Sequence, residues 1–143
     1  MIKLSIIYNT EKEEAIKIYK ELSKYLKSKK EFEILDDKNL SQAEYIVVIG
    51  GDGTLLRSFK KIKNKEVRII AINSGTLGYL TEIRKDAYKE IFENILKGKI
   101  NIEERYFFTV KIGKKKYNAL NEIFLTKDNI KRNIVSSEIY VDD

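Results

Sequence analysis

The stretch Val47-Val48-Ile49-Gly50-Gly51-Asp52-Gly53-Thr54 carries the most information in this sequence of 143 residues. It begins as an apolar run, typical of a buried strand, and ends in three glycines and one aspartate. Glycine has no Cβ atom to keep a polyphosphate away from the backbone, and it permits positive φ angles. If residues 55–59 begin a helix, its unpaired N–H groups add to an anion site. The stretch therefore predicts a strand, a helix and, between them, a phosphate loop made by Gly50, Gly51, Gly53 and Thr54.

Asp52 is the unexpected member of this loop, because a carboxylate repels phosphate. Its presence is explained if it holds a divalent metal or accepts a proton from an attacking hydroxyl group. Phosphoryl transfer, with Asp52 as the catalytic residue, is therefore the first hypothesis. The alternative is a plain Asp-Gly turn, which favours the same residue types.

Composition favours a soluble intracellular domain and excludes several kinds of active site. The chain has 43% hydrophobic residues, no cysteine and no histidine. This excludes disulfides, thiol nucleophiles, Ser-His triads and Cys/His zinc sites, so carboxylates must perform any acid–base chemistry. No apolar run approaches the length of a membrane span, and the N-terminal residues resemble a strand rather than a signal peptide. We expect a cytoplasmic protein that does not bind a membrane.

The net charge of +6, from 28 basic and 22 acidic residues, favours an anionic partner. The lysines are spread over predicted helix faces, without the interleaved aromatic residues of a platform for single-stranded nucleic acid. We therefore expect no nucleic-acid partner. Arg57 lies about one helical turn after the glycine loop, where its planar guanidinium could reach phosphate or ribose. The alternative for Arg57 is an ordinary exposed helix residue.

The first hundred residues alternate between strand and helix patterns. Thr10 and Glu13 have the spacing of a capping box, and apolar residues then repeat at helical spacing over 15–26. The alternation predicts a parallel sheet with right-handed crossovers, in which ligands gather beyond the carboxyl ends of the strands. Asp52 and Asn73 both fall there. The predicted strands are 2–8, 32–35, 45–49 and 67–72.

One more helix is predicted after residue 86, and after Gly98 the pattern changes from α/β to mostly β. Asp86 is predicted to cap a helix with apolar positions over 91–96, and Gly98 ends it. Strands are predicted over 105–112, 116–126 and 134–141, with turns at Gly113 and residues 128–129. We therefore expect an α/β nucleotide- and phosphate-binding domain over 1–100, Rossmann-like in its parallel sheet. The start of a β-rich domain is expected over 101–143.

The predicted strands near the end of the chain have apolar side chains and no sequence left to cover them. Such strands make a poor independent domain, and their open edges invite pairing with another chain. We expect an incomplete polypeptide that self-associates, as a homo-oligomer or an aggregate.

Two further segments have residues suited to a nucleotide. Asn73 could form hydrogen bonds to a base or ribose, and Tyr79 could pack near adenine. The alternative, which this segment favours when taken alone, is a glycine-containing loop with Tyr79 and Leu80 in the core. Asn121 and Glu122 place two polar groups within a predicted apolar strand, and such groups need partners. A sugar diol would satisfy both. The alternative is one outward residue and one at a bulge.

Three motifs, in this order and spacing, resemble the bacterial NAD kinase family: residues 49–54, residues 73–81 and residues 119–122. Diacylglycerol kinases, sphingosine kinases and 6-phosphofructokinases have similar glycine loops, but their second motifs differ from Asn73-Ser74-Gly75-Thr76-Leu77-Gly78. The resemblance covers nearly all of this chain and about the first half of a family member. Family members continue into a second glycine-aspartate-glycine segment and further strands.

The resemblance implies transfer of a terminal phosphoryl group from ATP or polyphosphate to the 2′-hydroxyl of the adenosine ribose of NAD. The product would be NADP, and a divalent cation of the Mg²⁺ type would be required. Asp52 matches the proton acceptor of the family. The NAD-binding positions that match are Asp52, Gly53, Arg57, Asn121, Glu122 and Arg132.

Two other functions remain open at this point. The chain could be a catalytically silent nucleotide-binding or assembly module made of the same residues, because part of the family pattern is missing. It could also be a lipid or sugar kinase of the same superfamily. The sequence leaves open whether ATP or polyphosphate is the donor and whether NADH is accepted.

Overall fold

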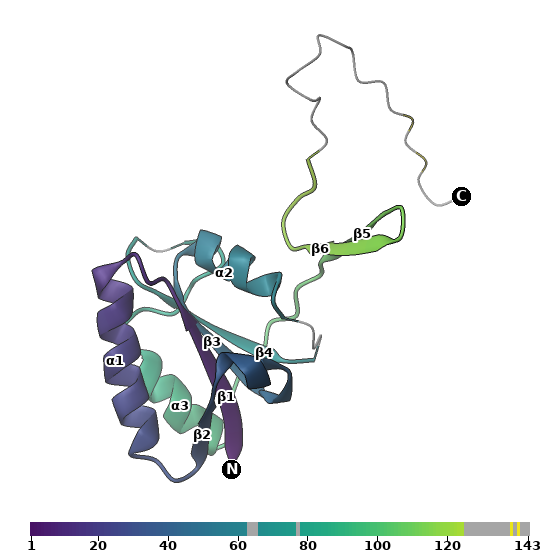
Figure 1. Ribbon diagram of the computed structural model, residues 1–143. Coiled ribbons are helices and arrows are strands. Elements are labelled where there is room, and N and C mark those ends of the chain that lie inside the picture. Colours follow the sequence, from purple (N-terminus) through teal and green to yellow (C-terminus); the bar gives the residue numbers. More distant parts are fainter. Residues whose placement is uncertain (63–65, 77, 125–137, 139, 141–143) are drawn as a thin grey trace.

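The computed structural model describes residues 1–62, 66–76, 78–124, 138 and 140. Its body is a parallel sheet with strand order β2-β1-β3-β4, followed in the chain by an antiparallel hairpin of β5 and β6 (Figure 1). The predicted α/β fold class is confirmed. The strands are β1 (Ile2–Tyr8), β2 (Phe32–Leu35), β3 (Tyr45–Gly50), β4 (Arg68–Asn73), β5 (Phe108–Ile112) and β6 (Lys115–Ala119).

Helices cover both faces of the parallel sheet. Helix α1 (Glu13–Lys27) and helix α3 (Tyr88–Leu96) pack on one face, as Figure 1 shows. The 3₁₀ helix η1 (Asp37–Gln42) and helix α2 (Asp52–Phe59) belong to the other face. All six residues of β3 are buried, which explains its unbroken apolar sequence. No helix in the described part of the chain is long and apolar enough to cross a membrane.

The sequence pattern of α1 explains both its packing and its ends. Ala15, Ile18, Leu22 and Leu26 are buried at helical spacing, so one stripe of the helix faces the sheet. Glutamates occupy the first turn and lysines the last turn, where each sign of charge is stabilised by the helix dipole.

The strand order reverses direction between β1 and β3, and parallel sheets of this kind commonly bind ligands at the carboxyl ends of the strands beside such a reversal. The chain passes from β1 to β2 on one side of β1, and then crosses to β3 and β4 on the other side. The register pairs Tyr8 with Ile49 and Gly50 with Asn73, so the three strands end side by side. Such a switch point leaves a crevice between the loops that follow the two central strands.

The hairpin of β5 and β6 has little apolar burial of its own. Phe108, Ile112 and Tyr117 are 56%, 65% and 50% exposed. Gly113 makes the turn with a φ of 58°, as predicted. Figure 1 shows the hairpin standing apart from the parallel sheet. The predicted strand over 134–141 and the turn at 128–129 lie outside the described residues, apart from Glu138 and Tyr140, which are not in a strand.

Two predicted helix caps are wrong. The N-cap of α1 is Lys12, which makes no side-chain cap bond. The preceding turn is organised by Asn9 instead of Thr10, because Asn9 Oδ1 accepts from Glu11 N at 2.9 Å. The N-cap of α3 is Ala87, because the Asp86 carboxylate pairs with the Arg84 guanidinium at 2.7 Å. Gly98 does end the helix region, with a φ of 65°.

Candidate functional site

The glycine loop joins β3 directly to α2, and its glycines have different structural roles. A Cβ atom at Gly50 would overlap the Thr54 side chain, so only glycine allows the strand to meet the helix this closely. Gly51 is the N-cap of α2, and its carbonyl oxygen accepts from Thr54 N at 2.8 Å. Helix α2 therefore begins at Asp52, three residues earlier than the sequence suggested. Asp52 lies in the first helical turn, at the positive end of the helix dipole.

Asp52 joins the glycine loop to the loop that follows β4. Its Oδ2 accepts from Tyr79 N at 2.8 Å, and its Oδ1 accepts from Leu80 N at 3.1 Å. Oδ1 also accepts from both Thr81 N and Thr81 Oγ1, each at 3.0 Å. One carboxylate thus receives four hydrogen bonds from three consecutive residues. We call these contacts the Asp52 latch.

The buried side chain of Asn73 forms hydrogen bonds within the loop that follows β4. Its Nδ2 donates to Thr76 O at 2.8 Å and to Thr81 Oγ1 at 2.9 Å, while its Oδ1 accepts from Gly75 N at 2.7 Å. The Asn73 side chain is buried, at 3% exposure. The carboxamide therefore shapes the loop, and the predicted contact of Asn73 with a nucleoside stays a prediction.

Thr81 is a residue of the candidate site to which the sequence analysis gave no role. It is fully buried, and its hydroxyl donates to Asp52 while accepting from Asn73. Gly78 lies against the same group, since a Cβ atom there would overlap the Asp52 carboxylate. In the sequence, a threonine that follows a loop of small residues could have been considered for the site. Only the three-dimensional structure shows that its hydroxyl bonds the Asp52 carboxylate.

The environment of Asp52 keeps its carboxylate ionised. Partial burial favours the neutral form and would raise its pKa, but the four hydrogen bonds favour the anion and together lower the pKa below its ordinary value. Asp52 is therefore negatively charged at neutral pH. Oδ2 accepts only one of the four bonds, so it keeps room for another donor.

The N-terminus of α2 offers backbone donors beside this carboxylate. Among the described residues, the amide N–H groups of Asp52 and Gly53 donate to no protein acceptor. Gly53 is exposed. Arg57 is also exposed, and its Nη1 would lie 3.8 Å from a Cβ atom built at Gly53. The arrangement places an anion, two open amides and a guanidinium along one edge of the sheet.

Tyr79 lies at the surface of this site and not in the core. It is 81% exposed, and the Arg105 guanidinium lies 5.6 Å from its ring centroid. The interpretation of Tyr79 as a core residue is therefore wrong. Its neighbour Leu80 does pack, against the cluster under α2.

Asn121 and Glu122 are not within a strand, contrary to the prediction. Strand β6 ends at Ala119, and both residues follow it with exposed side chains. Pairing with β5 stops at Phe108–Ala119, so Ile123 and Phe124 do not extend the hairpin. Within the described residues, neither side chain contacts the Asp52 latch. Arg132 lies outside the described residues.

The described residues contain no group of three or more carboxylates that could hold a metal ion by themselves. Mg²⁺ commonly keeps several waters and uses one or two carboxylates together with substrate phosphates. Asp52 Oδ2 fits a single ligand position of that kind. A protein cage for a divalent cation is absent from this part of the chain.

Sequence comparison finds two kinds of match. Residues 36–100 match the family model of the ATP-NAD kinase N-terminal domain. All 143 residues align at 91% identity with 54% of an NAD kinase from Fusobacterium nucleatum subsp. nucleatum. A bifunctional NADP phosphatase/NAD kinase from Methanocaldococcus jannaschii matches 99% of the chain at 37% identity, over 27% of its own length. The chain thus spans about half, or less, of these curated relatives.

Two solved structures resemble the fold. A yeast NADH kinase complexed with NADH has a TM-score of 0.72 at 15% identity, covering 85% of this chain and 44% of the other. An NAD kinase from Archaeoglobus fulgidus in complex with ATP has a TM-score of 0.50 at 26% identity, covering 76% and 41%. The first likeness concerns the fold alone. The sequence matches lead to one conclusion: this chain is similar to NAD kinases over its whole length, and the family resemblance predicted from its three motifs is confirmed.

Proposed function

We propose that the protein containing this chain is an NAD kinase, which phosphorylates the 2′-hydroxyl of the adenosine ribose of NAD to give NADP. The observation that carries the proposal is the Asp52 latch. It holds an ionised carboxylate beside the open amides of α2, with one oxygen still able to accept a hydrogen bond. The similarity to NAD kinases supports the choice of substrates.

The proposed step balances with Asp52 as proton acceptor. The ribose oxygen attacks the terminal phosphorus of the donor, a new P–O bond forms, and the bond to the leaving phosphate breaks. The hydroxyl proton passes to Asp52 Oδ2, and the shortened donor leaves with the electron pair. Because the pKa of Asp52 is lowered, its carboxylate is a weak base, and proton transfer accompanies the arrival of the phosphoryl group instead of preceding it. Positioning and charge neutralisation supply most of the acceleration.

The residues proposed to bind NAD are Asp52, Gly53, Arg57, Asn121, Glu122 and Arg132. The backbone of Gly50, Gly51, Gly53 and Thr54 is proposed to face phosphate, and Asn73 and Tyr79 to lie near the nucleoside. The open N–H groups of α2 and the exposed Arg57 support this assignment. A divalent cation would bind to the donor phosphates and would neutralise charge on the transferred group.

The division into an α/β domain over 1–100 and a β-rich segment over 101–143 is part of the same proposal. It is supported by the covered faces of the parallel sheet and by the uncovered hairpin. The exposed apolar residues of the hairpin also support self-association of the chain. We place the reaction in the cytoplasm, where both substrates are available.

The test is NADP formation, followed by a coupled assay, on this chain and on a longer protein that contains it. We expect the longer protein to convert NAD with ATP or polyphosphate, and the 143-residue chain to be inactive. NADH, diacylglycerol and fructose 6-phosphate serve as competing acceptors. Faster phosphorylation of a lipid or sugar than of NAD would favour another kinase of the superfamily. Absence of any transfer by the longer protein would favour a silent nucleotide-binding module.

A further inference from the structure

The chain between α3 and β5 contacts the α/β domain with alternate side chains. Arg105 and Phe107 both touch residues of the domain, whereas Tyr106 between them is 95% exposed. This alternation is typical of an extended segment with one side against a surface. In Figure 1 the segment passes beside the end of α2 before it reaches β5. Residues 105–107 therefore dock on the domain that carries the Asp52 latch, and they lead directly into the hairpin.

Arg105 contacts the loop that follows β4 at both ends of the part that bonds Asp52. Its guanidinium carbon lies 5.6 Å from the centroid of the Tyr79 ring, and its Nη2 lies 3.1 Å from Glu82 Oε1. The latch donors are the backbone N–H groups of residues 79–81 and one hydroxyl. Asp52 thus bonds the backbone of this loop, while Arg105 contacts the side chains that flank the same N–H groups.

Phe107 contacts the other element of the latch. Its ring centroid lies 5.3 Å from that of Phe59, and the two planes meet at 64°, an edge-to-face arrangement that aromatic pairs favour. Phe59 is the last residue of the helix that Asp52 begins. Residues 105–107 therefore contact both structures that the latch joins: α2 through Phe107, and the loop after β4 through Arg105.

The contacts of Arg105 restrict the position of the loop more than they stabilise the fold. The side chains of Arg105 and Glu82 are 33% and 61% exposed, and ion pairs in such positions add little to global stability because water screens them. The guanidinium is planar, however, and presents its donors in fixed directions. Its contacts with a carboxylate and a ring of the same loop therefore define where that loop lies.

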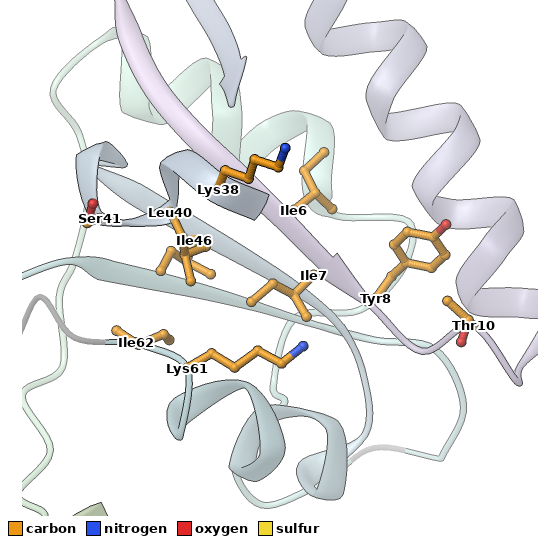
Figure 2. Close-up of a pocket in the computed structure, with 10 residues that line it drawn as sticks. All are labelled: Ile6, Ile7, Tyr8, Thr10, Lys38, Leu40, Ser41, Ile46, Lys61 and Ile62. Carbon is orange, nitrogen blue, oxygen red and sulfur yellow. The ribbon is translucent and has the colours of Figure 1, made fainter. Parts of the chain in front are cut away.

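These contacts lie apart from the pocket shown in Figure 2. That pocket, of about 610 Å³, lies on the face of the sheet that carries η1 and α2. It is lined by residues of β1, β3 and η1 and by residues 61–62, and its described lining includes neither Phe59 nor a residue that Arg105 contacts. An effect of Arg105 on the reaction would therefore act through the Asp52 latch and not through this pocket.

We propose that Arg105 is a positioning residue, which holds the loop that orients the Asp52 carboxylate. Because β5 begins at Phe108, the same segment also sets where the hairpin, and the NAD contacts proposed at Asn121 and Glu122, lie relative to Asp52. A misplacement of about 1 Å between reacting groups can cost about a hundred-fold in rate. This inference rests on the proposed function, since it concerns the proton transfer assigned to Asp52.

The first test needs no kinase activity. Amide hydrogen exchange at residues 79–81, followed by NMR in the 143-residue chain, reports how often the latch opens. Arg105→Ala should speed this exchange about ten-fold, because it removes an ion pair and a cation–π contact together. Glu82→Gln, which removes only the ion pair, should speed it about three-fold. Unchanged exchange in Arg105→Ala would overturn the proposal.

Glu103 supplies a matched control for Glu82. Both carboxylates lie close to the same guanidinium, at 3.0 and 3.1 Å, and their side chains are 65% and 61% exposed. Only Glu82 belongs to the loop that follows β4, so Glu103→Gln should leave the exchange of residues 79–81 unchanged. Tyr106→Ala is the corresponding control for Arg105→Ala. Equal acceleration by the Glu82 and Glu103 variants would overturn the proposal.

The second test is steady-state kinetics of the longer protein. Arg105→Ala should lower kcat and kcat/KM equally, by about ten-fold, because a misplaced proton acceptor affects the transition state and not substrate binding. Arg105→Lys should restore part of the rate, since it keeps the charge without the planar fork. The thermal unfolding temperature should change by no more than about 4 °C. A raised KM for NAD at unchanged kcat would mean that Arg105 acts on binding through Tyr79, and would overturn the proposal.

The outcome is separable from that of the proposed function. If the longer protein makes NADP and Arg105→Ala makes it at the same rate, the positioning role fails and the kinase assignment stands. If hydrogen exchange responds as expected but NAD is never phosphorylated, the kinase assignment fails, and the contact of Arg105 with the latch loop stands without that reaction.

Discussion

The parallel sheet and the β5–β6 hairpin differ in how far their apolar side chains are buried. The sheet buries apolar residues on both faces, between α1 and α3 on one side and η1 and α2 on the other. In the hairpin, by contrast, the aromatic residues Phe108 and Tyr117 are 56% and 50% exposed. The candidate site is thus built on the part of the chain whose sheet is covered on both faces. The NAD-binding residues expected near the hairpin have no such support.

The largest expected effect tests whether Asp52, at the edge of the parallel sheet, is the proton acceptor. In the longer protein, Asp52→Asn should lower turnover by roughly two to four orders of magnitude, the usual range for a positioned general base. The amide also disturbs the latch, because its NH₂ group cannot accept from Tyr79 N or Leu80 N. NADP formation under saturating substrates is the measurement.

Thr81→Val is the control for that disturbance, since it removes one latch bond and keeps the carboxylate. We expect Thr81→Val to lose far less turnover than Asp52→Asn. Equal losses in the two variants would mean that Asp52 acts only by holding the loop that follows β4. Near-normal turnover of Asp52→Asn would exclude Asp52 as the proton acceptor.

Truncating one phenylalanine in each region compares how much each region contributes to the free energy of unfolding. Phe92 of α3 is fully buried, whereas Phe108 of β5 is 56% exposed. Phe92→Ala should lower the free energy of unfolding by about 3–5 kcal/mol, because it leaves a cavity in the core. Phe108→Ala should change it by about 0.5 kcal/mol or less, as for other surface positions. Chemical denaturation of the 143-residue chain measures both. A large loss for Phe108→Ala would show that the hairpin is packed after all.

The proposed NAD contacts after β6 should give a smaller effect. Asn121→Ala or Glu122→Ala in the longer protein should weaken NAD binding by about 1–3 kcal/mol, the cost of one lost buried hydrogen bond. ATP use should change less, since these residues are proposed to contact only the dinucleotide. Asn118→Ala is the matched control, because Asn118 lies in β6 and accepts from Thr109. Equal effects on both substrates in steady-state titrations would indicate a structural role.

The smallest expected effect is the pH dependence of stability that comes from the latch. Hydrogen bonds lower the pKa of Asp52 in the folded chain from its ordinary value of 3.8, although burial acts in the opposite direction. The stabilisation is therefore present above pH 3.8 and is lost as the pH falls through the folded value. Thr81→Val should reduce this pH dependence, because it removes one donor to the carboxylate.

The control for the pH experiment comes from the hairpin. Thr109→Val removes a hydroxyl whose hydrogen bond goes to Asn118, a neutral side chain. We expect Thr109→Val to leave the difference in unfolding free energy between acid and neutral pH unchanged. An identical slope in wild type and Thr81→Val would show that the Thr81 hydroxyl does not influence the titration of Asp52.

The sequence alone was sufficient for most of the sheet and for the family. Strand β1 was predicted with its observed bounds, and the apolar run before Gly50 identified β3, because a short continuous apolar run that ends at glycine is typical of a buried parallel strand. The glycine loop was recognisable because glycine is the residue that allows a strand to meet a helix this closely, and a Cβ atom at Gly50 would overlap Thr54. The helix caps were predicted wrongly, since Asn9 instead of Thr10 bonds the turn before α1 and the Asp86 carboxylate pairs with the Arg84 guanidinium.

Only the tertiary structure decided what Asp52 and Thr81 do for each other. They are 29 positions apart, and hydrogen bonds across that separation exist only because β3 and β4 end side by side. The same holds for the pocket on the η1 and α2 face of the sheet, where Lys38 and Lys61 come from separate connections. Residue types and periodicity determine which elements form and what chemistry they could support. Which side chains meet depends on strand order and register, which no local pattern contains.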